Sequence, residues 1–392
     1  MINSNNNSSM PVDINDGADT SVSSTTSSSS SASESTYNKL SAPSSTQDHL
    51  TVEDIAKRIL CFPTQARTSR ELRALPTSQR EKVWADMTGD PLLSNYAPMV
   101  ETPEFISRCL SKLEAEIAAI VDKPAYDKAC KQDPGYLRHP QFRLMFLRAD
   151  EYKIDAAAAR MVHHFNAKLE LFGEAALTRD IDIHDFDEDD LQSLRAGGIQ
   201  ILPDPDRAGR PIIFTCNTCF RYKEHSNMLR TMWYTLMTAM EQEDGQRLGI
   251  VDVSYHIGQR HSSYDCELRR QLIAMTKCIP VRFVSTYICF SSSVWLPIAD
   301  LISHMVSPTL RMRLRTIHGS PQEVLYSLMA LGIPRLSLPF ADDGEISLDD
   351  HKVWIEEQLR GDDFFDDCHP GEYALTDSMG MHLQMDAKMD CQ

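Results

Sequence analysis

The sequence predicts an α/β fold, in which helices cover a mixed, mostly parallel sheet and an all-α N-terminal module precedes it. Three observations support this prediction. Apolar residues recur at helical spacing up to Gly173, short β-rich runs alternate with helical runs after Gly198, and 42% of the 392 residues are hydrophobic. Strands that are separated by helices are typical of βαβ units, whose strands lie parallel.

The first segment, residues 1–48, is dominated by Ser, Thr, Asn and Asp and includes the serine run from Ser27 to Ser31. It has too few apolar side chains to offset the entropy cost of ordering the chain, so we expect a disordered tail. Its serines are candidate phosphorylation sites, and a solvated leader is the simpler alternative.

Residues 49–175 read as a helical region. Helices are expected after Thr51, over residues 68–87, and from the Thr102-Pro103 pair to about residue 122, because a Thr N-cap followed by Pro is typical of a helix start. Two more helices are expected between Pro140 and Gly173, the second capped by Asp155 and ended by Gly173.

Residues 176–345 form the predicted α/β domain, and residues 346–392 add a C-terminal helix and an acidic tail. We expect strands at Ile199 to Leu202, Pro211 to Thr215, Gly249 to Ile257, Val281 to Phe290, and Arg311 to Ile317. Helices are expected at about 224–241, 264–277, 297–306, 321–331 and 348–359. The polar turn from Asp204 to Arg210 joins the first two strands as a hairpin, because Gly209 tolerates a positive φ and Pro211 suits the start of a strand.

The motifs of several enzyme classes do not occur. Neither a G-x-G-x-x-G nor a G-x-x-x-x-G-K-[ST] stands at a strand-to-helix turn, and G-x-S-x-G does not occur. We therefore expect no enzyme and no cofactor. A formal net charge of −17 argues against nucleic acid as a partner. The ten scattered cysteines and the polar start of the chain favour a reduced, cytoplasmic protein, and no apolar run is long enough to span a membrane.

Three local patterns have simple structural readings. Cys216 and Cys219 form a single C-x-x-C without a second pair at zinc-ligand spacing, so small boundary residues are favoured over a redox or zinc site. The acidic run from Asp180 to Asp190 lacks the glycine and final glutamate of a calcium loop. Asp187 to Asp190 are read as capping and charge-matching the start of the helix that ends near Ala196. His163 and His164 are expected to be surface or packed histidines, and no metal site is predicted.

The segment "SVWLPIADLISHMVSP" predicts an amphipathic helix that starts at Pro297. Its pattern alone favours packing on the core, with a movable lid as the alternative. In the strand predicted after it, Arg311, Arg313 and Arg315 alternate with apolar residues. A solvated edge is the ordinary reading of these arginines, and a patch that contacts phosphate is the functional one.

Three stretches together resemble the CRAL-TRIO family of lipid-binding and lipid-transfer proteins. "FRLMFLRADEYKIDAAAARMVHHFNAKLELFG" is similar to its helical N-terminal module, "GGIQILPDPDRAGRPIIF" to its G-...-D--GRPV hairpin, and "VWLPIADLISHMVSPTLRMRLRTIHGSPQEVLYSLMALGIPRLSLPFADDGE" to its W---KPFL-P-T--KI stretch. The resemblance spans residues 140–345. It implies a sheet that floors an apolar pocket and an amphipathic helix that acts as a lid.

The resemblance also implies site residues. For the lipid pocket they are Val251, Val253, Tyr255, Phe283, Ser285 and Tyr287; for the lid they are Trp295, Ile298, Leu301, Ile302 and Met305; for a headgroup or membrane phosphate they are Arg311 and Arg313. Ile298 and Ala299 lie where the family has its first lysine, and Pro280-Val281-Arg282 stands in place of PER. Asp252 is kept, but Tyr255 replaces the glycine of D-x-x-G. These departures favour an apolar-ligand pocket over phosphatidylinositol specificity.

The resulting hypothesis is a non-enzymatic protein that binds one hydrophobic ligand or phospholipid in an internal pocket and transfers or presents it at membranes. Its expected partners are a lipid or other hydrophobic small molecule and a transient membrane surface. The sequence neither identifies nor excludes a protein partner. The alternative is a protein-interaction adaptor that uses the same fold without lipid exchange.

Overall fold

The computed structural model describes residues 63–90, 100–260, 264–292 and 295–360. The chain divides into two units, Met1–His49 and Leu50–Gln392, and all described residues belong to the second. The predicted disordered tail, the helix after Thr51 and the acidic C-terminal tail lie outside the described residues.

Two helices begin the described chain, α2 (Pro63–Ala74) and α3 (Thr77–Thr88). The sequence predicted one continuous helical stretch over 68–87, and this is corrected because the two helices are separated at Leu75 and Pro76. Proline has no N–H to donate and disfavours the helical conformation of the residue before it, so the first helix must end there.

A helical bundle follows, and its long central helix α8 contacts α4, α5 and α7. The helices are α4 (Pro103–Ala119), α5 (Pro124–Gln132), α6 (Pro134–Arg138), α7 (Pro140–Ala149) and α8 (Ile154–Phe172). The Thr102 hydroxyl accepts a hydrogen bond from the Phe105 amide at 3.2 Å, as expected of the predicted N-cap. Asp155 does not cap α8, which begins one residue earlier, and it lies in the first turn, where a negative charge is favourable.

The sheet has five strands in the order β1-β2-β3-β4-β5. They are β1 (Ile199–Ile201), β2 (Ile212–Cys216), β3 (Ile250–Tyr255), β4 (Phe283–Phe290) and β5 (Leu314–His318). The predicted hairpin makes β1 antiparallel to β2, and the other three pairings are parallel. This confirms the predicted mixed, mostly parallel sheet covered by helices.

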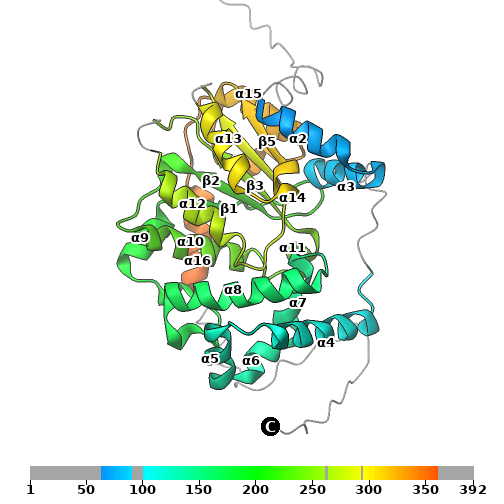
Figure 1. The fold of residues 1–392 in the computed structure, drawn as a ribbon. Coiled ribbons are helices and arrows are strands. Elements are labelled where there is room, and N and C mark those ends of the chain that lie inside the picture. The colour runs from blue at the N-terminus through cyan, green and yellow to red at the C-terminus, as the bar shows by residue number, and fades with distance from the viewer. Residues whose placement is uncertain (1–62, 91–99, 261–263, 293–294, 361–392) are drawn as a thin grey trace, which may run out of the picture. The chain divides into compact units, whose positions relative to one another are not determined.

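Strands that are neighbours in sequence are also neighbours in the sheet, which decides where the helices lie. Right-handed crossovers between such strands place all connecting helices on one face. The connecting helices are α10 (His225–Thr238), α11 (Glu243–Leu248), α12 (Cys266–Met275), α13 (Leu296–Met305) and α14 (Pro308–Met312). Figure 1 shows their order along the sheet.

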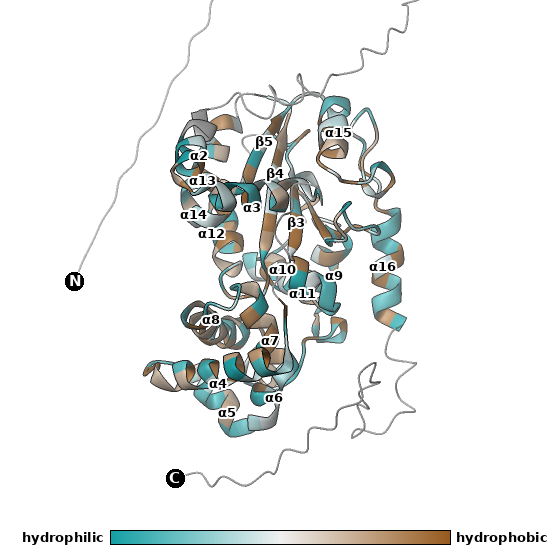
Figure 2. Cartoon of the chain, turned by 90° about the vertical axis from the view of Figure 1, so that its right-hand side faces the viewer, coloured by the Kyte–Doolittle hydropathy of each residue, from teal (hydrophilic) through white to brown (hydrophobic). Residues whose placement is uncertain are grey.

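The opposite face of the sheet is covered by α15 (Pro321–Ala330) and the chain that follows it, including Leu338 and Phe340. In Figure 2 α12, α13 and α14 lie on one side of the strands, and α15 and α16 (Asp349–Arg360) lie on the other. Helix α9 (Glu188–Arg195), capped by Asp187 as predicted, contacts α10 and α16. Short 3-10 helices occur at Glu174–Ala176, Ile183–Asp185, Asn217–Cys219 and Arg335–Ser337.

The polar turn between β1 and β2 is held by a buried ion pair. The Arg210 guanidinium donates to the Asp206 carboxylate, with Nε–Oδ2 and Nη2–Oδ2 distances of 2.9 and 2.5 Å. The other carboxylate oxygen accepts from the amides of Ala208 and Arg210, both at 3.0 Å. The turn therefore satisfies its own polar groups and leads directly into a buried strand.

Candidate functional site

An apolar cavity of about 90 Å³ lies between the sheet and helices α10, α12 and α13. Side chains from the helices form its walls, among them Met232, Leu272 and Ile302. At roughly 10–15 Å³ for each water, the space would hold about six to nine water molecules. It is also smaller than the roughly 300–1,000 Å³ of pockets that hold small organic ligands.

The floor of the cavity carries polar side chains, which is unusual for a buried sheet face. Thr215, Asp252, Ser254 and Thr286 come from three adjacent strands, and Asp252 is paired in register with Thr286. Burial raises the pKa of the Asp252 carboxyl to about 7, although Arg269, Thr215 and Thr286 act in the opposite direction. The cavity thus has apolar walls and a hydrogen-bonding floor.

A chain of hydrogen bonds runs from this floor to the carboxyl ends of the strands. The Ser254 hydroxyl lies 3.2 Å from Nε2 of His256, whose Nδ1 is 3.2 Å from the Asn217 amide nitrogen. The Asn217 carbonyl oxygen accepts a hydrogen bond from Arg269. Burial, with Arg269 nearby, lowers the pKa of His256 to about 3, so its ring is neutral at physiological pH.

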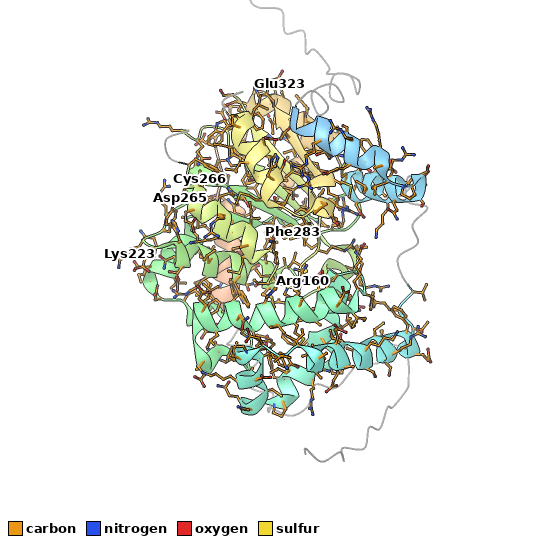
Figure 3. The ribbon with its side chains drawn as sticks, in the orientation of Figure 1. Arg160, Lys223, Asp265, Cys266, Phe283 and Glu323 are labelled. Atoms are coloured by element: carbon orange, nitrogen blue, oxygen red, sulfur yellow. The ribbon has the colours of Figure 1, made fainter. Side chains whose placement is uncertain are left out.

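A second, polar cleft of about 280 Å³ adjoins the cavity at this end of the sheet. Arg269 and Leu272 line both spaces, so the two adjoin at these side chains of α12. In parallel sheets, ligands commonly bind at the carboxyl ends of the strands. Asp265 and Cys266, labelled in Figure 3, mark the start of α12 beside the cleft.

Of the six side chains predicted for the lipid pocket, only Phe283 lines this cavity. Val251, Val253, Tyr255 and Tyr287 belong to the core on the opposite face, against α15. The buried Ser285 also has that parity, because it is paired with Val251 and alternates with Thr286. Phe283 does not, because it lies before the register shift that separates the Ile250 and Val251 pairings. The predicted strand parity is therefore corrected for this cavity: apolar composition could not decide it, since both faces of the sheet are covered.

The predicted lid corresponds to α13 and the residue before it. Trp295, Ile298 and Ile302 are buried, and Ile302 lines the cavity. Met305 is half-buried, while Leu301 points away from the core with 46% of its surface exposed. Trp295 lies 5.1 Å from the His256 ring and 5.6 Å from the Tyr264 ring, centroid to centroid. The helix thus covers the cavity with one face and exposes a leucine on another.

Arg311 and Arg313 are not exposed, which corrects their prediction as phosphate contacts. Nε of Arg311 lies 3.0 Å from the Glu71 carboxylate of α2. Nε and Nη2 of Arg313 lie 2.9 and 2.5 Å from the Asp86 carboxylate of α3. Both arginines precede β5, so the predicted strand over 311–317 begins too early. Their charges form ion pairs within the protein, which hold α2 and α3 against α14 and the residue after it.

The other candidate patterns form no metal site, because no group of three or more His, Cys, Asp or Glu side chains within the described ranges could hold an ion. His164 is buried against the Trp233 ring at 4.5 Å, and His163 is exposed. The sulfur atoms of Cys216 and Cys219 lie 3.3 Å apart, and the hydrogen bond from Cys219 lowers the pKa of Cys216 to about 7.

The polar floor was not predicted, although the sequence carries a signal for it. Asp252 and Ser254 alternate with valine and tyrosine in a strand that is otherwise apolar. In a strand covered on both faces, such an alternation indicates that one face meets polar groups or a cavity. No sequence pattern marked Arg269 as a site residue, because it lies in an ordinary amphipathic helix.

No family model and no curated protein matches this chain. Among solved structures, 23 chains match, and one of them is the crystal structure of Sfh5. That match covers 67% of this chain and 100% of Sfh5, with 9% sequence identity and a TM-score of 0.39. Among the described residues, no helix is both long and apolar enough to cross a bilayer.

Proposed function

We propose that this protein is a non-enzymatic binder of a single hydrophobic or amphipathic molecule, such as a lipid, which it carries or presents at membranes. The observation on which the proposal depends is the apolar cavity between the sheet and α13. Exposing apolar chains to water costs about 0.8 kcal/mol per methylene, so two long acyl chains cost on the order of 20 kcal/mol. A carrier must therefore enclose them.

The proposal assigns α13 the role of the lid. At about 90 Å³ the cavity is too small for a lipid, so a wall has to move before one can enter. Among the walls, α13 combines a cavity-facing Ile302 with an exposed Leu301. An exposed leucine beside a movable apolar face suits contact with a membrane surface.

The first experiment asks whether the protein holds a ligand. The full chain is incubated with phosphatidylcholine vesicles, reisolated and analysed by native mass spectrometry with lipid extraction, and one bound lipid per protein is expected. Protein that remains ligand-free would overturn the binding proposal and favour the adaptor alternative.

The second experiment tests the lid with Leu301→Asp. The substitution places a charge on an exposed position, so the fold should tolerate it, and we expect vesicle flotation to fall by at least tenfold. Leu336→Asp is the matched control, because Leu336 is 88% exposed and lies outside the lid. Equal flotation of the two variants and the unchanged protein would show that α13 is not the membrane-contacting element.

A further inference from the structure

The polar cleft beside the cavity has the geometry of a binding site for a small group. Residues after β2, residues after β3 and the start of α12 line it, and its volume is about 280 Å³. Figure 3 labels Asp265 and Cys266 at the start of α12, and Asp265 lines the cleft. The lining includes Asn217, Thr218 and Gln259, which are neutral hydrogen-bonding side chains.

The side chains that line the cleft have a net positive charge, whereas the chain as a whole has a net negative charge. Arg221, Arg260 and Arg269 line it, and Asp265 is the single carboxylate among its described lining residues. The chain as a whole has a formal charge of −17. The Asp265 carboxylate already accepts hydrogen bonds from Tyr222 at 2.9 Å and from the Leu268 amide at 2.8 Å, and His225 Nε2 lies 2.8 Å away. The cleft therefore keeps a local excess of positive charge.

Neutral acceptors hold two of these arginines in place. Nη1 of Arg221 donates to the carbonyls of Thr218 and Phe220 at 3.1 and 2.7 Å. Arg269 donates to the Asn217 side chain. Within the described ranges, neither guanidinium lies within 4 Å of a carboxylate oxygen. Their positions are thus set by hydrogen bonds to neutral groups, and Asp252, which interacts with Arg269 at longer range, has its pKa raised by burial to about 7.

The cleft and the apolar cavity adjoin at Arg269 and Leu272. A molecule with its apolar part in the cavity would therefore place a polar end next to the arginines. We infer that the ligand is an amphiphile whose anionic group, of phosphate type, binds in the cleft at Arg221 and Arg269. The inference rests on the proposed function for the apolar part, whereas the anion site itself depends only on the cleft.

The test compares two ligands that differ by one phosphate, 1-oleoyl lysophosphatidic acid and 1-oleoylglycerol. Their affinities for the full-length protein are measured by calorimetry below the micelle concentration, with inorganic phosphate as a third probe and as a competitor. We expect the phosphate-bearing amphiphile to bind at least tenfold more tightly, because charge-assisted hydrogen bonds to two arginines add to the apolar term. Arg221→Gln with Arg269→Gln should abolish this preference.

Arg270→Gln is the matched control. Arg270 is the next residue on α12, is exposed, pairs with Glu267 and does not line the cleft. Arg269→Lys keeps the charge and should retain part of the preference, which separates a loss of the anion site from a loss of fold.

The outcomes separate the two proposals. Equal binding of both amphiphiles, unchanged by the double substitution, would overturn the anion site and leave the apolar pocket standing. Phosphate binding that requires Arg221 and Arg269, without binding of either amphiphile, would support an anion site for a free phosphate compound and contradict the proposed function. Failure of all three probes would overturn both.

Discussion

Asp252 is the side chain whose environment differs most from what its position in a strand predicts. It lies on the floor of an apolar cavity, and burial raises its pKa from 3.8 to about 7. Between these two values the folded state binds more protons than the unfolded state, so this carboxyl makes stability fall as pH rises from about 4 to 7. At pH 8 its charge is present and unfavourable.

Asp252→Asn should therefore stabilise the protein relative to the unchanged chain, and more so at high pH. We expect the difference in the free energy of unfolding to grow between pH 5 and pH 8 by up to ~3 kcal/mol. Urea denaturation at both pH values measures it, with Asp342→Asn as an exposed control. A difference that does not change with pH would contradict the raised pKa.

At the scale of elements, two ion pairs join the first helices to the chain around α14. Asp86 of α3 pairs with Arg313 and Glu71 of α2 pairs with Arg311, and the hydroxyl of Tyr287 in β4 donates to the carbonyl of Met87. The sequence predicted a strand here from the alternation of arginines. The competing signal was Ser307 followed by Pro308: the Ser307 hydroxyl caps α14 by accepting from the Leu310 amide at 3.2 Å.

Asp86→Asn should destabilise the protein by about 3 kcal/mol, because it leaves the buried Arg313 charge without its partner. Thermal or urea unfolding measures the loss. Asp342→Asn provides the comparison here too, since its pair with Arg335 is exposed and should contribute less than about 1 kcal/mol. Similar effects of the two substitutions would show that the Asp86 pair is solvated in solution.

At the scale of the whole molecule, the two faces of the sheet should behave differently at a membrane. Helix α13 covers a cavity, whereas α15 packs on a large apolar core through Val324, Leu325 and Leu328. Opening the lid would expose the smaller apolar cluster that α13 forms with Ile288 and Leu314, whereas moving α15 would expose the larger core on the opposite face.

We therefore expect hydrogen exchange of the α13 amides to speed up at least tenfold when phosphatidylcholine vesicles are added, while that of the α15 amides stays unchanged. Peptide-resolved exchange with mass spectrometry measures both helices in one sample. Equal rates for α13 with and without vesicles would contradict a lid that opens at membranes.

The sequence alone determined the fold class, the order of most elements and the hairpin at Asp206 and Arg210. These follow from local periodicity, caps and turn chemistry, which act between residues a few positions apart. The tertiary structure decided which face of the sheet meets the cavity, that Arg311 and Arg313 are buried in ion pairs, and that Arg221 and Arg269 share one cleft. Those outcomes depend on contacts between residues distant in sequence, such as Asp86 and Arg313, and on which helices cover each face. The alternation of Asp252 and Ser254 is the local sign of the polar face, whereas no local pattern encodes the ion pairs or the shared cleft, because any arginine can be either solvated or paired.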